Sequence, residues 1–131
     1  MSVELRSILL LMAAALSGCA LPVRQMALSA PLVPASGHTF VLAKDLNCSI
    51  STGYGRTLRA GTRWDLFGTI DRGAVYRSQD ELLTVEGFNV HEAYLVIKDE
   101  SLVGFYLPVE KTFTPVSRVT KLQLTSHKEY Q

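Results

Sequence analysis

Short runs of apolar and β-branched residues, separated by polar turns, make up most of the chain from residue 38 onward. The clearest run is Arg63–Ile70, in which apolar and polar positions alternate with the period of two that is typical of a strand with one buried side. The predicted inward set is Trp64, Leu66, Gly68 and Ile70. Asp71-Arg72-Gly73 then predicts a turn.

A second pattern predicts a strand that is covered on both faces. Residues Val90–Lys98 form the longest candidate strand, and Ala93–Ile97 within it are apolar at every position, as expected at the centre of a sheet. Leu102–Leu107 is the next strand, with Gly104 as a predicted bulge or point of close packing. Residues 109–117 are predicted to be a loop, and Val119–Thr125 to be the last strand.

The remaining runs predict further short strands and no helix. They are Thr39–Asp45, Leu58–Ala60, Ala74–Arg77 and Leu82–Glu86, while Asn47–Ser51 is either a hairpin partner or an irregular edge. Turn residues recur roughly every 8–12 positions, a spacing that favours an all-β fold. We therefore predict a small antiparallel β-barrel or β-sandwich over residues 38–126, followed by a short tail at 127–131.

Residues 19–37 carry no strand or helix period and contain Pro22, Pro31 and Pro34. Each proline removes a backbone donor and disfavours helix before it, so the segment is predicted to be a flexible linker. An extended chain of about 3.1 Å per residue would reach on the order of 50 Å. The apolar side chains in this segment leave open that part of it packs on the domain.

The first 18 residues form a predicted leader. Ile8–Leu16 is an uninterrupted apolar run preceded by Arg6, which is typical of a signal peptide. A membrane-spanning helix needs about 20 predominantly apolar residues, so this run is too short to cross a bilayer. Leu16-Ser17-Gly18-Cys19 follows, with two small residues before a cysteine.

This tetrapeptide resembles the lipobox of bacterial lipoproteins. The resemblance implies that Cys19 receives a diacylglyceryl group, that the leader is cut before it, and that a further acyl chain, such as palmitate, is often added. Ala20, rather than Asp, follows the cysteine, which in enterobacteria favours sorting to the outer membrane. Two or three acyl chains make attachment effectively permanent. The expected location is the bacterial cell envelope, with the domain facing the periplasm.

Charge and cysteine content exclude some functions. From residue 38 onward the chain has 11 Lys and Arg against 11 Asp and Glu, so a nucleic-acid partner is not expected. If Cys19 carries lipid, Cys48 has no partner within the chain for a disulfide. An unpaired cysteine in an exported protein indicates either an intermolecular bond or a buried thiol.

No catalytic or metal-binding pattern stands out. His91-Glu92 begins like a zinc-protease motif, but that motif needs a second histidine at position 95, which is Leu95. We predict His91 to be a solvent-facing strand residue. No metal, no cofactor and no enzymatic activity are expected.

The densest group of basic and aromatic residues is the candidate binding surface. It consists of Tyr54, Arg56, Arg59, Arg63 and Trp64. Such residues can bind an anionic ligand or the acidic face of a partner; alternatively the arginines form a solvated rim and Trp64 belongs to the core. The first hypothesis is a non-enzymatic module that binds an envelope protein. The alternative is a module for glycan, peptidoglycan or lysozyme, because Ser51-Thr52-Gly53-Tyr54 resembles a loop of lysozyme-inhibitor lipoproteins.

Overall fold

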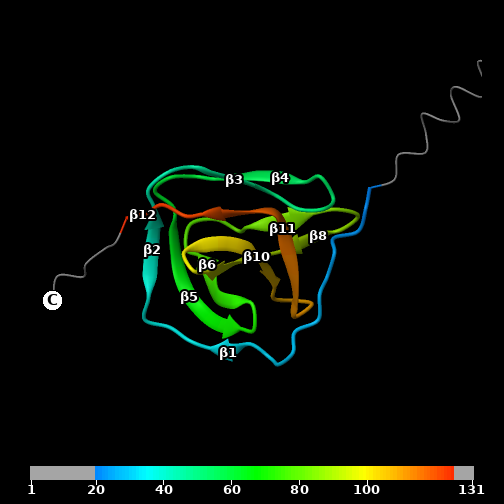
Figure 1. The fold of residues 1–131 in the computed structure, drawn as a ribbon, viewed down its shortest axis with the longest axis horizontal. Helices are drawn as coiled ribbons and strands as arrows, with labels where there is room; N and C mark the ends of the chain where they lie inside the picture. The colour runs from blue at the N-terminus through cyan, green and yellow to red at the C-terminus, as the bar shows by residue number, and fades with distance from the viewer. Residues whose placement is uncertain (1–19, 126–131) are drawn as a thin grey trace, which may run out of the picture.

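The computed structural model describes residues 20–125, which form antiparallel strands and no helix (Figure 1). The predicted signal peptide, the predicted lipidation site Cys19 and the predicted tail at 127–131 lie outside the described residues. The strands are β1 (Val33–Pro34), β2 (Thr39–Leu42), β3 (Leu46–Ser49), β4 (Gly55–Leu58), β5 (Arg63–Ile70), β6 (Gly73–Ser78), β7 (Thr84–Glu86), β8 (Val90–Glu92), β9 (Tyr94–Lys98), β10 (Ser101–Leu107), β11 (Thr112–Lys121) and β12 (Leu124–Thr125).

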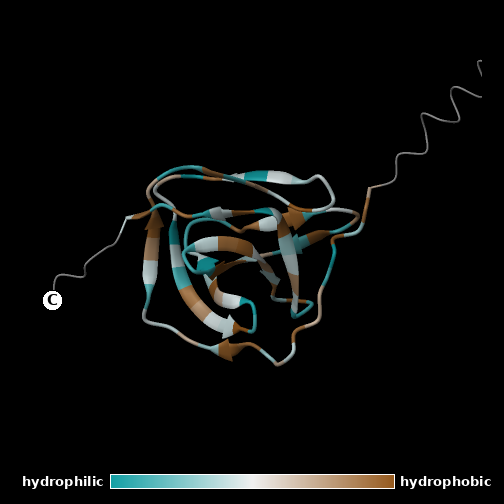
Figure 2. Ribbon diagram, viewed as in Figure 1, coloured by the Kyte–Doolittle hydropathy of each residue, from teal (hydrophilic) through white to brown (hydrophobic). Residues whose placement is uncertain are grey.

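One large sheet, in the order β11-β10-β9-β6-β5-β2-β12, organises the described part of the chain, and β1 pairs with β5 beside it. The hairpins β3-β4 and β7-β8 form two smaller sheets. The outer strands β11 and β12 follow each other along the chain, but no ladder joins them, so the sheet is not a closed barrel. The predicted all-β antiparallel fold is confirmed, in a form compatible with a β-sandwich. Figure 2 shows apolar residues along the strands of the large sheet.

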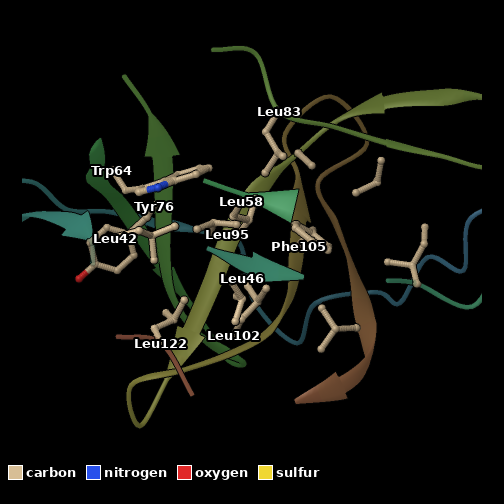
Figure 3. Close-up of a cluster of buried hydrophobic side chains, with 14 of the residues drawn as sticks. Leu42, Leu46, Leu58, Trp64, Tyr76, Leu83, Leu95, Leu102, Phe105 and Leu122 are labelled. Carbon is tan, nitrogen blue, oxygen red and sulfur yellow. The ribbon is translucent and has the colours of Figure 1, made fainter. Parts of the chain in front are cut away.

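The first apolar cluster fills the space between one face of the large sheet and the β3-β4 hairpin. Its buried side chains point toward one another (Figure 3). They include Leu42, Leu46, Leu58, Trp64, Tyr76, Leu83, Leu95, Leu102, Phe105 and Leu122. The hairpin is held over this cluster by Leu46 and Leu58, which are cross-strand partners, and by a bridge between Ile50 and Val116 of β11. Residues 47–49 of the predicted segment therefore belong to a hairpin strand, as in the first of the two alternatives, while Ile50 and Ser51 lead into the turn.

The second apolar cluster lies on the other face and contains Val75, Tyr94, Val96, Tyr106 and Phe113. Its cover is the N-terminal segment (residues 20–37), from which three half-buried apolar side chains pack against it. These side chains belong to Met26, Leu28 and Leu32.

The backbone of the N-terminal segment is also paired with the sheet. Met26 exchanges two backbone hydrogen bonds with Phe113, of 2.7 and 2.9 Å, and Val33 pairs with Thr69 of β5. The predicted flexible linker is therefore corrected for these residues, because its apolar side chains close a face of the sheet that would otherwise meet water. Part of the segment packs on the domain, which is the alternative that the sequence left open.

A bulge in β5 changes the predicted facing of that strand. The register with β6 shifts between Leu66 and Gly68. Trp64 and Leu66 join the first cluster as predicted, and Phe67 lies in the second cluster on the opposite face, but Ile70, predicted to share the side of Trp64, also joins the second cluster. One extra residue in a strand reverses the alternation beyond it, so the single inward set over the whole run is wrong in its second half. The predicted irregularity at Gly104 is confirmed by a similar shift in β10.

Two further boundaries differ from the prediction. Residues 112–117, expected to lie in a loop, belong to β11, where Pro115 is accommodated because β11 is an outer strand of the large sheet. The long strand predicted over Val90–Lys98 is divided at Ala93 into β8, which pairs with β7, and β9, which lies between β6 and β10. The doubly covered centre is confirmed, since Leu95 and Val96 have no exposed surface.

Candidate functional site

A cavity of about 360 Å³ opens between β4, the start of β5 and the segment that precedes β7. Arg56, Arg59 and Trp64 of the predicted binding surface line it, together with Glu81. Arg56 and Leu58 are two positions apart in β4, so their side chains lie on the same face of the strand. Because Leu58 is buried in the first cluster, Arg56 also points toward the large sheet and reaches the cavity. We call this feature the arginine cavity.

The arginine cavity is weakly neutralised. The Nη2 atom of Arg56 lies 3.7 Å from Oε2 of Glu81, whose side chain is largely exposed. An exposed ion pair of this kind contributes about 0–1 kcal/mol, so Arg56 can exchange Glu81 for another anion at little cost. The backbone of Arg59 is held by Thr62, whose hydroxyl donates to the Arg59 carbonyl at 2.8 Å, while the side chain of Arg59 remains exposed.

Trp64 forms part of the inner wall of the cavity and is not a platform for stacking. Only 3% of its surface is exposed. Its indole N–H donates to Oγ1 of Thr62 at 3.0 Å, and its ring stacks against Phe40 at 6.5 Å between centroids. A ligand in the cavity therefore meets the guanidinium groups and hydroxyls rather than the indole face. This agrees with the alternative interpretation in which Trp64 belongs to the core.

The other two residues of the predicted surface lie elsewhere. Arg63 precedes Trp64 in a strand, so its side chain points to the opposite side of the sheet and stays exposed. Tyr54 packs half-buried against the first cluster from the turn that precedes β4. The structure thus brings Arg56, Arg59 and Trp64 together in the arginine cavity, which Arg63 and Tyr54 do not line.

Arg63 instead lines a second hollow of about 710 Å³. His38, Thr39 and Asp65 also line this hollow. Nδ1 of His38 lies 2.9 Å from the hydroxyl of Tyr76, and Thr39 donates to Oδ1 of Asp65 at 2.6 Å. Burial raises the pKa of Tyr76. The sequence pattern did not indicate this group, because His38 and Tyr76 are far apart in the chain and meet only through the pairing of β2, β5 and β6.

His91 is buried, which corrects the predicted solvent-facing position. It was predicted to face solvent, but only 8% of it is exposed, and its Nδ1 lies 2.6 Å from Oε1 of Glu110 in the turn after β10. The division of the long strand at Ala93 explains the difference, because β8 leaves the large sheet to pair with β7 and turns His91 inward, opposite buried Val85. The pair joins β8 to the β10-β11 turn.

Cys48 is a half-buried free thiol in β3. Burial raises its pKa from an ordinary value near 9 to about 11, against the smaller opposing effect of the Arg56 charge. Its Sγ also lies 3.4 Å from the Arg56 carbonyl oxygen. Because the thiolate is the nucleophile, a thiol with so high a pKa reacts slowly at neutral pH. The geometry gives Cys48 the character of a buried thiol rather than that of a catalytic residue.

Metal sites, membrane-spanning helices and similar proteins were also sought. Across residues 20–125, no group of three or more His, Cys, Asp or Glu residues is arranged to hold a metal ion. Within the same residues, no helix has the length and apolar character needed to cross a membrane. The chain matches no protein-family model, no curated protein and no solved structure.

Proposed function

We propose that this chain is a lipid-anchored lipoprotein of the bacterial cell envelope, with a non-enzymatic role in binding a protein partner. The observation that carries the anchor is the sequence Leu16-Ser17-Gly18-Cys19 after a short apolar run and directly before a folded domain. Ala20 favours the outer membrane, with the domain facing the periplasm. The acyl chains on Cys19 then supply the membrane attachment.

The arginine cavity supports the choice of a protein partner. Arg56 and Arg59 present two guanidinium groups, against which the cavity sets the single carboxylate of Glu81. A guanidinium group binds a carboxylate through two parallel hydrogen bonds, so an aspartate or glutamate side chain of a partner fits this site. The inaccessible indole of Trp64 argues against sugar rings stacked in the cavity.

The anchor is tested by the intact mass of the protein extracted from membranes without reductant. We expect a chain that begins at Cys19 and carries two or three acyl chains. The matched control is Cys19→Ser, which should leave the membrane fraction and retain its leader. A mass that begins at another residue, or an acyl-free chain, would overturn the anchor. The same spectrum shows whether Cys48 carries a disulfide-linked adduct.

The partner is tested by crosslinking in intact membranes, followed by mass spectrometry. We expect a reproducible envelope protein whose recovery falls at least about tenfold in the double variant Arg56→Glu plus Arg59→Glu, since like charges at an interface cost several kcal/mol. Arg118→Glu is the control, because Arg118 is also an exposed arginine but lies on β11. Equal recovery from both variants, or no crosslinked protein, would contradict the proposal.

The alternative is a module that binds glycan, peptidoglycan or lysozyme. The observation that favours it is the set of hydroxyl groups beside the two arginines, from Thr57, Thr62 and Ser78, which together suit a carboxylated glycan. Purified sacculi and lysozyme should then retain the wild-type protein and lose the same double arginine variant. Retention without a crosslinked protein partner would favour this class over the first.

A further inference from the structure

Exposed apolar side chains occur where the described chain enters the domain. Phe88 is 73% exposed, Val90 64% and Leu21 60%. Phe88 lies in the turn between β7 and β8, Val90 begins β8, and Leu21 is two residues after Cys19 in the sequence. The entering chain runs beside the β7-β8 hairpin (Figure 1). We call these three residues the entry patch.

The entry patch is held in place by backbone contacts. The N–H of Phe88 donates to the Leu21 carbonyl at 2.9 Å, and Val23 is buried in the first cluster. Gly87 is packed so closely that a β-carbon on it would lie 2.5 Å from the Leu21 oxygen. Thr52 also contacts the hairpin here, donating its hydroxyl to the Glu86 carbonyl at 2.8 Å. The chain is therefore fixed to the domain from Leu21 onward.

We propose that the entry patch docks on the lipid surface that holds the acyl chains of Cys19. The proposal rests on the lipid anchor of the proposed function. Only Ala20 lies between Cys19 and Leu21, so the two residues are at most about 7 Å apart, whereas a flexible linker through residue 37 would reach on the order of 50 Å. With so short a connection, the domain has no room to stand clear of the head groups, and its nearest surface is the apolar patch.

The chemistry of the patch fits the interface of a bilayer. An aromatic ring and two aliphatic side chains enter the boundary between head groups and acyl chains favourably, and exposed Arg24 nearby can meet lipid phosphates. Glu86, the cross-strand partner of Val90, is also exposed and lies on the same face of the hairpin, where its carboxylate can remain among the polar head groups. Because the anchor keeps the patch at a high effective concentration near the lipid, weak contacts are enough to fix the orientation.

This orientation leaves the arginine cavity accessible. The Gly55 end of β4 follows the Thr52 turn, which contacts the β7-β8 hairpin, while Arg59 lies past the opposite end of β4. A partner can therefore reach Arg59 from the side away from the lipid.

The test places a tryptophan in the patch of the full acylated protein. Phe88→Trp is compared with Val119→Trp, a control whose parent side chain is 59% exposed near the far end of β11. Trp64 is the only native tryptophan and is buried, so the parent protein supplies a constant background. Each protein is first checked by intact mass for acyl chains. It is then reconstituted into phosphatidylethanolamine and phosphatidylglycerol vesicles with or without lipids brominated near the head group.

We expect the brominated lipids to quench the added fluorescence of Phe88→Trp at least about twofold more than that of Val119→Trp. Equal quenching of the two acylated variants, strong or weak, would overturn the docking and leave the patch to a protein partner or a second copy. A mass without acyl chains would instead overturn the anchor, and the docking with it. The two failures are thus distinguished by the mass measured before reconstitution.

Discussion

The two faces of the large sheet are covered by chain segments of opposite character. The first face is covered by the β3-β4 hairpin, whose strands carry their own alternating pattern. The second face is covered by the N-terminal segment, which is rich in proline and has only the two-residue strand β1. A segment without periodicity can therefore cover a sheet when the face beside it is apolar.

The apolar run Ala93–Ile97 indicates that a second covering segment must exist, which the pattern of the proline-rich segment itself does not indicate. A strand that is apolar on both faces requires two covers, because exposed apolar area costs roughly 25 cal/mol per Å². The hairpin supplies one cover, so a second segment has to supply the other. Leu28 and Leu32 belong to the part of the chain that does so. Their role as a cover follows from the apolar side chains on both faces of β9 and not from the residues next to them in the sequence.

The largest effect is expected from a charge in the strand between the two faces. Val96→Asp should abolish the cooperative thermal melt followed by circular dichroism, because Val96 has no exposed surface and lies against the second cluster. An unpaired buried charge costs several kcal/mol or more, against a total stability of about 5–15 kcal/mol. Val119→Asp, at an exposed site, should melt near the wild type. A normal melt of Val96→Asp would show that the second face is open to water.

Local pattern was enough to predict the class of fold and most of the strands. It correctly placed the doubly covered centre and the irregularity at Gly104. It did not predict the bulge at Phe67, because a bulge is set by pairing with β6 and leaves the sequence alternation unchanged. The strand around Pro115 was missed for a similar reason, since proline is tolerated only once β11 is known to be an outer strand.

The candidate site was predictable only in part. Arg56, Arg59 and Trp64 are near one another in the chain and come together where the loop after β4 leads into β5. Glu81, which completes the arginine cavity, comes from a distant loop with no pattern of its own. The pairing of His91 with Glu110 depends on β8 leaving the large sheet, which no local signal indicates.

A smaller effect is expected where the N-terminal segment crosses β5. A β-carbon at Gly68 would lie 2.5 Å from Cδ2 of Leu32 and 2.7 Å from the Val33 carbonyl oxygen. Gly68→Ala should therefore lower the free energy of unfolding by about 1–3 kcal/mol, measured by urea titration. If the segment were a loose linker, the same change would be neutral or would stabilise by about 0.4–1 kcal/mol.

The control for this substitution is Gly55→Ala in β4. There the nearest atom to an added β-carbon is the Cys48 oxygen at 3.6 Å, an ordinary contact. We expect its free energy of unfolding to stay within about 0.5 kcal/mol of the wild type. A similar loss in both glycine variants would show that the effect at Gly68 does not come from the N-terminal segment.

Alkaline pH should lower the free energy of unfolding through ionisation of Cys48, which packs against the first cluster. The pKa of this thiol is about 11 in the folded protein, whereas it is near 9 when the chain unfolds, so the unfolded state loses its proton first. The stabilisation is complete below about pH 9 and is lost as the pH rises towards about 11.

Urea midpoints at about pH 8 and about pH 10.5 measure this loss. The midpoint should fall more for the wild type than for Cys48→Ala. Tyr76, Tyr94 and Tyr106 also have pKa values raised by burial, but they are present in both proteins. Equal falls in the two proteins would mean that the thiol is as well hydrated in the folded state as in the unfolded state.

The smallest effect on stability should come from removing the contact between Ser29 of the N-terminal segment and Asp71 in the β5-β6 turn. The Ser29 hydroxyl donates to Oδ2 of Asp71 at 2.9 Å and its N–H does so at 3.2 Å. These hydrogen bonds, the hydroxyl one first, lower the pKa of Asp71, with Arg72 adding to the effect. The stabilisation is therefore present above the unfolded pKa near 4 and is lost as the pH falls below it.

Ser29→Ala should raise the pKa of Asp71 part of the way to its ordinary value, because the backbone N–H bond remains. Carbon-detected NMR of the carboxyl group follows this titration directly. The control Thr39→Ala removes a hydroxyl–carboxylate hydrogen bond elsewhere, from Thr39 to Asp65, and should leave the pKa of Asp71 unchanged. If Asp71 titrates identically in the wild type and in Ser29→Ala, the N-terminal segment is not held at this turn, and its apolar contacts, the Met26–Phe113 hydrogen bonds and the pairing of β1 keep it on the second face.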